Sequence, residues 1–537
     1  MSENTEIEAT AGDPLDMSNY NLNKLPKRDI KGFEAFLRKI GGPLAAIVFI
    51  YLYFFSDFSF LNNIDPATLS GRAREVFDEV GPVVFRAMNV GMMAVFIGAI
   101  ILWMTEAVPN YLTSLILIIA LVLTQVLPEV DAYHQLGHKV MWLNILSFIL
   151  ASMLVKTSLA KRFALAFLLK FGKKASSIFF SFIAINLVLS AFISATTAKA
   201  AILLPIFMVV SAVYGATGGK NRNNFGRNMV LQNLLQINLA AGAFVTGSGA
   251  NLLAAALIGG AIGSDVFFMD WMKVAFPLAL ALMILGYFVG VKWIFRLKPN
   301  EKTPQLKGGL DSLRKELDGM GKMGMEEFKA IFIFSGVLIL WTTDRYHGIS
   351  ATSVAFIGAV IALLPRIGII KWNDVDIPWH LLLFSAGAYT LGAGFKATGL
   401  PSISVNATFD YFNLGDGTPF WVLYVILTGM MIFSALVFQS KTMRTLIFIP
   451  IAIGVAERFG FSVLSLALPV AFLIEHVYVL PFNSKPAALL YETDQYSYSD
   501  TFKYGITMMI LSWIVTLIMA ETWYKFWDIT PNGLGLF

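Results

Sequence analysis

Apolar runs of about 20 residues, separated by short polar segments, recur along most of the chain, and an α-helix needs this length to cross the hydrocarbon core of a membrane. Because backbone groups in lipid must be paired within their own segment, these runs are expected to be helices. In the first half we predict spans near residues 41–60, 85–104, 108–128, 140–158, 229–262 and 271–295. In the second half we predict them near residues 328–343, 350–365, 378–395, 463–490 and 504–522.

Two further apolar stretches, 177–215 and 418–456, are too long for one span, and each contains a polar break. Such a stretch predicts a re-entrant helical hairpin, which enters and leaves the membrane on the same side. Polar breaks also interrupt two of the predicted spans. The four breaks are expected at Ser194–Lys199, Thr246–Asn251, Ser440–Arg444 and Asn483–Pro486. The predicted fold class is therefore an all-α polytopic membrane protein with about eleven transmembrane helices and two re-entrant hairpins.

The two halves of the chain share short sequence matches in the same order. Ile101–Glu106 matches Ile339–Asp344, and Ala195–Lys199 matches Ser440–Arg444. Five spans in each half invert the second copy, and inverted repeats with broken helices are typical of secondary transporters, whose substrate sites form where the breaks meet. The expected divisions are a polar cytoplasmic N-terminal segment, a first span with its loop, a first repeat, a cytoplasmic linker, a second repeat and a tail, at residues 1–40, 41–84, 85–295, 296–327, 328–525 and 526–537.

Composition and charge favour the same class. The chain of 537 residues is 57% hydrophobic and 14% charged, whereas a soluble domain has about 25% charged residues. The absence of cysteine excludes disulfides, thiolate metal sites and thiol catalysis. Two loops predicted to lie inside, 156–174 and 216–227, contain lysine and arginine but no acidic residue, which favours a cytoplasmic N-terminus and a C-terminus outside the plasma membrane. The net charge of +5 is thus mostly loop charge and does not indicate nucleic-acid binding.

Two motifs point to a known family. Trp103–Pro109 reads WMTEAVP and looks like a W-x-T-E-A-x-P signature, and Trp379–Gly387 reads WHLLLFSAG and looks like a W-x-x-L-L-F-x-G-G segment. The sequence resembles, over about residues 85–525, the divalent anion/sodium symporter family, which includes sodium-dicarboxylate, citrate and sulfate transporters. The resemblance implies a homodimer and an elevator-like movement of a transport domain against a scaffold. It also implies a Ser-Asn-Thr motif at each hairpin tip, where substrate carboxylates and sodium bind.

The chain departs from this family at the hairpin tips. The first motif reads Ala195-Thr196-Thr197, and the second reads Ser440-Lys441-Thr442. The helix-break motif Ser248–Asn251 is ordinary for the family, but its partner Ser484–Ala487 contains a lysine and lacks the asparagine. These changes favour transport without sodium, and no metal site is predicted.

Four cations fall in or beside the breaks, and a charge at the bilayer centre costs about 2.5–3.5 kcal/mol on insertion scales. The break motifs contain no matching carboxylates, so we expect a bound anion to neutralise the cations; the alternative is that they reach an interface or pair with acids elsewhere. Hydroxyl and amide groups at the breaks would add neutral donors. The predicted substrate-binding residues are Thr196, Thr197, Lys199, Ser248, Asn251, Ser440, Lys441, Thr442, Arg444, Ser484 and Lys485.

Glu475 and His476 are predicted inside the tenth span, just before its break. A buried carboxylate–imidazole pair there is a candidate for proton coupling, with a packed, hydrogen-bonded pair as the structural alternative.

The leading functional hypothesis is a secondary transporter of small di- or tricarboxylates that works by sodium-independent exchange. One alternative is a sodium- or proton-coupled symporter of dicarboxylate or sulfate, and an alternative of another class is an anion channel. An enzyme is disfavoured because no nucleophile elbow, His-Glu-x-x-His run or phosphate loop occurs at a break. The expected partners are a small anion, the lipid bilayer and a second copy of the chain.

Overall fold

The computed structural model describes residues 15, 17 and 33–535, except 63, 70, 173, 220–221, 307–309, 376, 412–416, 439 and 482. Most of the predicted N-terminal segment 1–40 and the last two residues of the predicted tail therefore lie outside the described residues. Within the described part, all regular elements are helices, as the sequence predicts.

The first half contains eleven α-helices among the described residues. They are α1 (Phe33–Phe54), α2 (Gly71–Thr105), α3 (Asn110–Leu123), α4 (Glu129–His134), α5 (Lys139–Lys156), α6 (Leu159–Phe171), α7 (Ala175–Phe192), α8 (Thr196–Val213), α9 (Asn224–Gly242), α10 (Gly249–Ile262) and α11 (Phe268–Tyr287). A π-helical segment, Phe288–Ile294, continues α11. The helix α2 is kinked at Gly81, whose φ of 76° favours glycine, and Pro82 follows it.

The linker and the second half contain twelve more α-helices in the described part. They are α12 (Asp311–Gly319), α13 (Met325–Thr342), α14 (Asp344–His347), α15 (Ala351–Leu363), α16 (Trp379–Thr398), α17 (Leu400–Tyr411), α18 (Phe420–Phe433), α19 (Lys441–Arg458), α20 (Val463–Phe472), α21 (Lys485–Tyr491), α22 (Tyr498–Glu521) and α23 (Trp523–Phe526). Short 3₁₀ turns occur at Ser59–Leu61, Pro66–Thr68, Gln135–Gly137, Val245–Gly247, Pro299–Lys302, Trp372–Asp374 and Ser434–Leu436.

Seven helical segments in the described part are long and apolar enough to cross a membrane. They are Ala35–Phe54, Gly71–Thr105, Glu129–Lys156, Ala175–Phe192, Thr196–Val213, Phe268–Ile294 and Tyr498–Phe526. Other apolar helices are shorter: α3 and α10 have 14 residues each, and a helix of that length spans only about 21 Å. The count of about eleven spans therefore stays a prediction.

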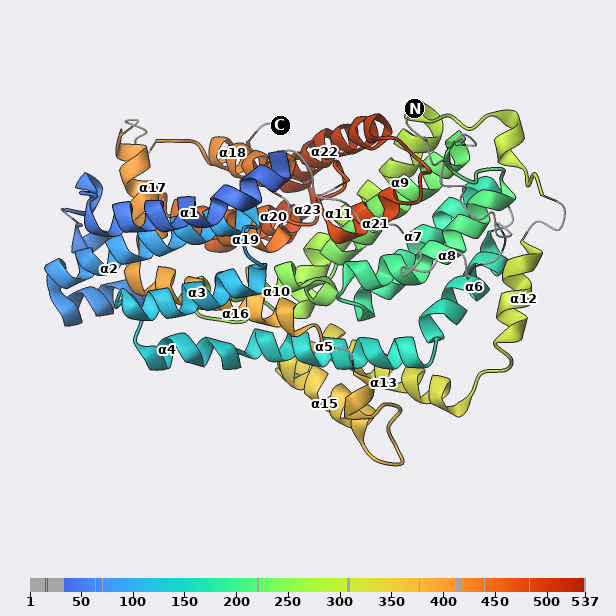
Figure 1. Ribbon diagram of the computed structural model, residues 1–537, viewed down its shortest axis with the longest axis horizontal. Helices are drawn as coiled ribbons and strands as arrows, with labels where there is room; N and C mark the ends of the chain where they lie inside the picture. Colours follow the sequence, from blue (N-terminus) through green and yellow to red (C-terminus); the bar gives the residue numbers. More distant parts are fainter. Residues whose placement is uncertain are drawn as a thin grey trace, which may run out of the picture.

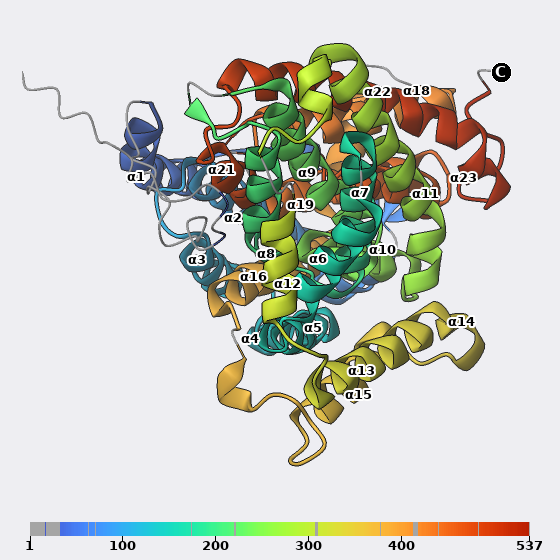
Figure 2. The ribbon, with the colours of Figure 1, turned by 90° about the vertical axis from the view of Figure 1, so that its right-hand side faces the viewer.

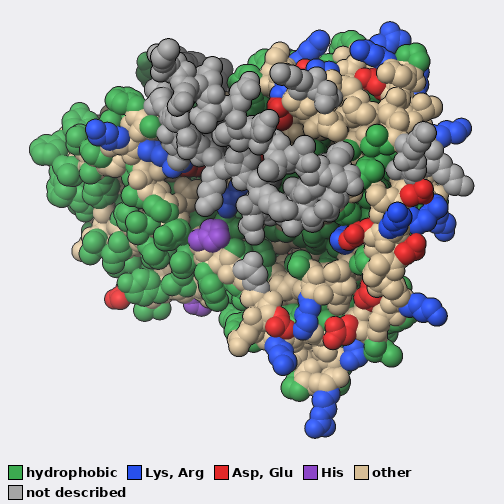
Figure 3. All heavy atoms as spheres, turned by 45° about the vertical axis from the view of Figure 1, so that its right-hand side comes forward, with side chains coloured by type: hydrophobic (Ala, Val, Ile, Leu, Met, Phe, Trp, Pro, Cys, Tyr) green, Lys and Arg blue, Asp and Glu red, His purple; other side chains and the backbone are tan. Residues whose placement is uncertain are grey.

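Helices from the two halves intermix. The helix α3 packs against α16, α5 packs against α15, and α10 packs against both α19 and α20. In Figures 1 and 2, α13 and α15 form one edge of the molecule beside α5, and in Figure 2 α18 and α22 lie at the opposite edge. Hydrophobic side chains cover much of the left part of Figure 3, whereas lysine, arginine, aspartate and glutamate gather on the right and at the lower tip. An extended apolar surface of this kind fits lipid rather than water.

Local features recur in the two halves in the order that the repeat hypothesis expects. Thr105 and Thr343 each hydrogen bond, at 2.7 Å, to the carbonyl oxygen four residues earlier. Left-handed residues, Ser158 (φ 53°) and Gly399 (φ 61°), follow α5 and α16 at matching positions. Each inner hairpin helix, α8 and α19, contains one proline. These pairs support the repeat, and the domain limits stay a prediction.

Candidate functional site

The first hairpin consists of α7 and α8, and the tip between them is Ile193–Ala195. The break falls within one residue of the predicted position. Thr196, the first residue of α8, is buried, and Thr197 is partly buried. Ala195 offers no side-chain cap to the first turn of α8. The free backbone N–H groups of that turn are therefore available to an acceptor from outside the helix.

The second hairpin consists of α18 and α19, with a 3₁₀ turn at Ser434–Leu436 leading into its tip. Ser440 caps α19, because its Oγ accepts a hydrogen bond from the backbone N–H of Met443 at 3.3 Å. Lys441 is the first residue of the helix, and Lys441 and Thr442 are both partly exposed. Of the predicted break, Ser440–Arg444, only Ser440 precedes α19, and the interruption begins at Ser434.

The break between α9 and α10 is closed by two side chains of its own motif. Ser248 caps α10 by accepting a hydrogen bond from the N–H of Asn251 at 3.3 Å. The Nδ2 of Asn251 donates to the carbonyl oxygens of Ala241 at 2.9 Å and Phe244 at 3.0 Å. The backbone groups released by the break are thus paired inside the protein, as they must be at membrane depth.

The second helix break begins ten residues earlier than predicted. The helix α20 ends at Phe472, and α21 begins at Lys485. Glu475 and His476 were predicted inside a helical span, and this prediction is wrong: both lie in the irregular segment between α20 and α21. The segment is apolar enough to be mistaken for helix, but the carbonyls of Leu473 and Ile474 are paired with a side chain from α19.

That side chain is Arg444, which is fully buried on α19. Its Nε donates to Ser434 Oγ at 2.8 Å, and its Nη1 donates to the carbonyl of Ile474 at 3.0 Å. Its Nη2 donates to the carbonyls of Leu473, at 3.3 Å, and Met431. Four of its five N–H groups therefore bind the protein itself. The prediction that Arg444 binds substrate is not supported by this geometry, because the guanidinium instead joins the second hairpin to the broken helix.

Lys199 occupies the equivalent position in the first hairpin and makes the equivalent contact. It is fully buried on α8, and its Nζ donates to Ser190 Oγ on α7 at 2.7 Å. Arg444 likewise bonds from the inner helix of its hairpin to a serine near the end of the outer helix. Each cation thus joins the two arms of its own hairpin by a hydrogen bond to a serine. Among the described residues, Lys199 has no carboxylate at ion-pair distance.

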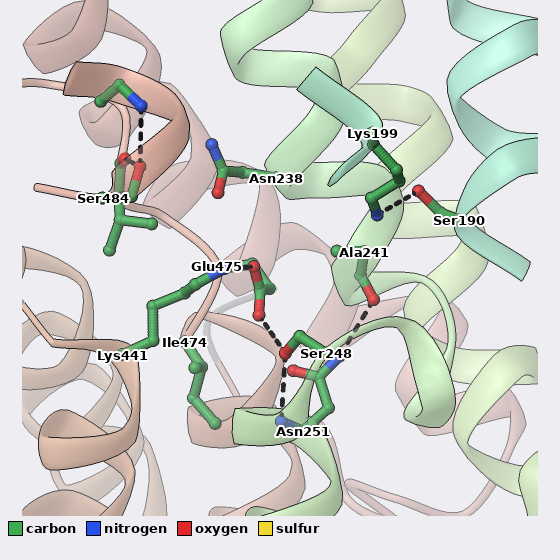
Figure 4. A network of polar contacts seen from close by, with 12 residues as sticks. Ser190, Lys199, Asn238, Ala241, Ser248, Asn251, Lys441, Ile474, Glu475 and Ser484 are labelled. Carbon is green, nitrogen blue, oxygen red and sulfur yellow. Dashed lines mark hydrogen bonds and ion pairs between the residues drawn. The ribbon is translucent and has the colours of Figure 1, made fainter. Parts of the chain in front are cut away.

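Lys441, by contrast, does have a carboxylate partner. Its Nζ lies 2.6 Å from Glu475 Oε2, and Ser248 Oγ donates to Glu475 Oε1 at 2.5 Å. The side chain of Lys441 is 15% exposed and that of Glu475 only 1%. Because Glu475 lies outside the break motifs, Lys441 follows the alternative given by the sequence, which is pairing with an acid elsewhere in the chain. Figure 4 shows Glu475 between Lys441 on one side and Ser248 on the other.

The predicted Glu475–His476 pair does not form. Both carboxylate oxygens of Glu475 are occupied by Ser248 and Lys441. The His476 ring is buried and has no side-chain hydrogen-bond partner of normal geometry among the described residues. It lies against the Tyr478 ring, with 5.7 Å between the ring centroids. A proton relay through this pair is not supported by the structure.

The remaining predicted residues lie around this centre. Ser484 caps α21 by accepting from the N–H of Ala487 at 3.2 Å, and its Oγ donates to the carbonyl of Val477 at 3.2 Å. Lys485 is exposed at the start of α21. Figure 4 places Ser484, Lys199 and the Lys441–Glu475–Ser248 bridge around one region, so three of the four breaks and the inner helix of the first hairpin contribute to it.

Asn238 is a residue that sequence reasoning missed. It lies on α9 and is fully buried; its Nδ2 donates to the carbonyl of Leu234 at 2.9 Å, and its Oδ1 has no partner in the described part. In Figure 4 it lies between Ser484 and Lys199. The available signal was an asparagine in an apolar run, four residues before the helix ends.

Space near these groups is limited in this conformation. A small cavity adjoins Glu475 and His476 and is otherwise lined by apolar residues of α9, α11 and α20. A larger cavity of about 410 Å³ lies between α5, α6, α8 and α12, and its lining includes none of the predicted substrate-binding residues. Among the described residues there is no cluster of histidine and acidic side chains that could hold a metal ion.

Comparison with known proteins identifies the family. The family model described as the sodium:sulfate symporter transmembrane region matches residues 82–529. A sodium-dependent dicarboxylate transporter, SdcS, of Staphylococcus saprophyticus is 26% identical over 480 residues, covering 84% of this chain and 89% of the relative. A putative malate transporter, YflS, of Bacillus subtilis is 26% identical over 444 residues, covering 81% and 90%. A protein of Cupriavidus necator named only as a membrane protein is 24% identical over 455 residues, covering 81% and 87%.

These matches confirm the resemblance seen at Trp103–Pro109 and Trp379–Gly387. They also agree with the multi-pass helical architecture. Because the family match covers most of the chain, the protein belongs to the sodium:sulfate symporter family and is a multi-pass membrane transporter rather than an enzyme.

Proposed function

We propose that this protein exchanges small dicarboxylate dianions across the plasma membrane, without sodium, by an elevator-type alternating-access mechanism. The substrate class is supported by the relatives, two of which are named as dicarboxylate or malate transporters. The observation that carries the proposal is the balance of buried charge at the helix breaks.

Three buried or largely buried cations and one carboxylate lie at the breaks, whereas the fourth cation, Lys485, is exposed and is not counted in this balance. Lys199 and Arg444 are fully buried, and Lys441 is largely buried and paired with Glu475. One of the three positive charges is thus neutralised, and two remain. A dicarboxylate dianion would cancel both, whereas a monoanion or a trianion would leave a net charge in a region where charge is costly.

The position of Lys441 argues against sodium coupling. Its ammonium lies at the tip of the second hairpin and already occupies Glu475 Oε2. A sodium ion would have to displace this ammonium to reach Glu475 Oε2. The lysine would therefore supply, beside this carboxylate, the positive charge that a sodium ion would otherwise supply.

The same charges favour exchange over net uniport. An empty carrier would move two uncompensated buried charges through a region of low dielectric constant. A bound dianion removes this cost, so the loaded carrier should reorient faster than the empty one. A homodimer, a cytoplasmic N-terminus and a C-terminus outside are part of the same proposal.

Uptake of radiolabelled succinate into sodium-free proteoliposomes tests this function. Vesicles preloaded with unlabelled succinate should take up label much faster than empty vesicles, and added sodium should leave the rate unchanged. Strict dependence on sodium would favour the second candidate, a sodium-coupled dicarboxylate symporter, which is the function named for the Staphylococcus relative. Equal rates in loaded and empty vesicles would contradict exchange.

A further inference from the structure

We propose that Glu475 is a tethered carboxylate that occupies a substrate-carboxylate position in the empty carrier and sets the valence of the anion carried. This inference rests on the proposed transport of anions at the helix breaks. It gives Glu475 a role as a specificity-determining residue, which differs from the proton relay predicted from the sequence.

The contacts of Glu475 are those that a substrate carboxylate would make. One oxygen accepts from Ser248 Oγ in the first helix break, and the other pairs with Lys441 at the second hairpin tip. A hydroxyl donor and an ammonium group are a suitable pair of partners for any carboxylate. Both residues were predicted to bind substrate, and in this structure a carboxylate of the protein itself binds them.

The tether makes Glu475 an internal competitor. An anion in solution meets Lys441 only at its own concentration, whereas the Glu475 side chain is attached at an effective concentration on the order of millimolar or higher. A substrate carboxylate must displace it or bind beside it, using the other donors of the site. In both cases Glu475 lowers the affinity of the site for an anion, and it does so more strongly the more stable its ion pair with Lys441 is.

Glu475 remains inside a positive environment whichever way it turns. The cations that face it are Lys441 and Arg444 on α19 and Lys199 on α8, all within electrostatic reach. The other polar groups around it are Ser248 and Asn251 at the start of α10, Asn238 on α9 and the neighbouring His476. In the count of buried charge, the carboxylate paired with Lys441 is therefore subtracted from the three cations.

This subtraction is the proposed valence filter. The net charge of Lys199, Lys441, Arg444 and Glu475 is +2, which a dianion neutralises. In a Glu475→Gln variant it would be +3, which a trianion neutralises. In a Lys441→Met/Glu475→Gln double variant it would return to +2. The ordering of anion preference should follow this net charge even where the absolute rates change.

The test uses the full-length chain in sodium-free proteoliposomes, at a pH at which succinate is a dianion and citrate a trianion. The KM of each anion is measured for the wild type, Glu475→Gln and the double variant. We expect Glu475→Gln to lower the KM for citrate relative to the KM for succinate by about tenfold, since one buried unit charge acts on the anion at short range. The double variant should restore the wild-type ratio.

Two further variants separate charge from folding. Glu475→Asp keeps the charge and should keep the wild-type ratio even if its rates fall. Glu457→Gln removes an exposed carboxylate at the far end of α19, which accepts from Ser402 at 2.7 Å, and should also leave the ratio unchanged. If a variant transports too slowly for a KM to be measured, its unfolding temperature in detergent is followed as succinate or citrate is added. The concentrations that stabilise the protein then give the ratio of its affinities for the two anions.

The outcomes are distinguishable. A wild type that neither binds nor transports either anion would contradict the proposed function itself. If the wild type transports succinate but Glu475→Gln has the same ratio of KM values for succinate and citrate as the wild type and Glu475→Asp, Glu475 is only a structural counterion. A double variant that keeps the citrate preference of Glu475→Gln would refute the net-charge argument.

Discussion

Replacing Arg444 should lower the stability of the fold itself, a structural role that the sequence did not predict. The guanidinium is fully buried and joins four groups: Ser434 Oγ and the carbonyls of Met431, Leu473 and Ile474. In Arg444→Met the first three groups keep other bonds within their own segments, since Ser434 donates to Met431 at 2.7 Å and Leu473 accepts the N–H of His476 at 3.3 Å. The carbonyl of Ile474 keeps no other bond among those found for the described residues.

The magnitude follows from this count. One unsatisfied buried carbonyl costs about 1–3 kcal/mol, and each lost hydrogen bond to a charged donor about 1.5–3 kcal/mol. Removing the desolvated charge offsets part of this loss. We expect a net destabilisation of about 3 kcal/mol. Arg444→Lys should recover only part of it, because an ammonium lacks the planar fork that reaches carbonyls on two segments.

Thermal unfolding of the purified protein, followed by tryptophan fluorescence in detergent, measures this effect. Arg74→Met on α2 is the matched control, because it removes an exposed pair with Asp78, of the kind worth about 0.3–0.5 kcal/mol. A protein that unfolds at the wild-type temperature but no longer responds to succinate would refute the structural role. Arg444 would then contact the substrate directly.

Two further changes test the packing around the site. Gly387→Ala should destabilise the protein by about 1–3 kcal/mol, because a Cβ at this position would lie 2.3 Å from Ser114 Cβ where α16 crosses α3; Gly336→Ala, where a Cβ meets nothing within 4 Å, is the control, and equal unfolding temperatures would refute the steric argument. Lys199→Met should abolish the stabilisation of the protein by succinate, and Ser190→Ala should preserve it, since the charge of Lys199 acts on the anion and Ser190 only orients the ammonium. Equal loss in both variants would show that the effect comes from the hydrogen bond between Lys199 and Ser190 and not from the charge.

The positions of three breaks could be predicted because local sequence determines them. Each of these breaks ends with a serine or an alanine, which precedes a helix whose first turn contains polar side chains. A capping serine such as Ser248 or Ser440 also indicates a helix start within a residue or two. Hydropathy likewise located most of the long helices.

The prediction of the fourth break includes its last residues, Asn483 and Ser484, but misses its start, because the residue that pairs its first carbonyls is distant in sequence. Leu473, Ile474 and Val477–Leu480 are apolar, and no glycine or proline interrupts them before Pro481. Arg444, about 30 positions earlier, pairs two of the carbonyls released where the helix ends, those of Leu473 and Ile474. The Lys441–Glu475 pair was missed for the same reason: Glu475 was assigned to a helix, where its side chain had no reason to meet the hairpin tip.

The four cations of the breaks separate into two pairs by their symmetry. Lys199 and Arg444 are equivalent in the two repeats, are fully buried, and each bonds a serine across its own hairpin. Lys441 and Lys485 stand where the first half has Thr196 and Gly249, and both are at least partly exposed. Symmetric residues are explained by a requirement that both repeats share, which is to hold a hairpin closed. The asymmetric lysines have no such explanation; Glu475 cancels the charge of Lys441, so the symmetric cations Lys199 and Arg444 also supply the charge that attracts the anion.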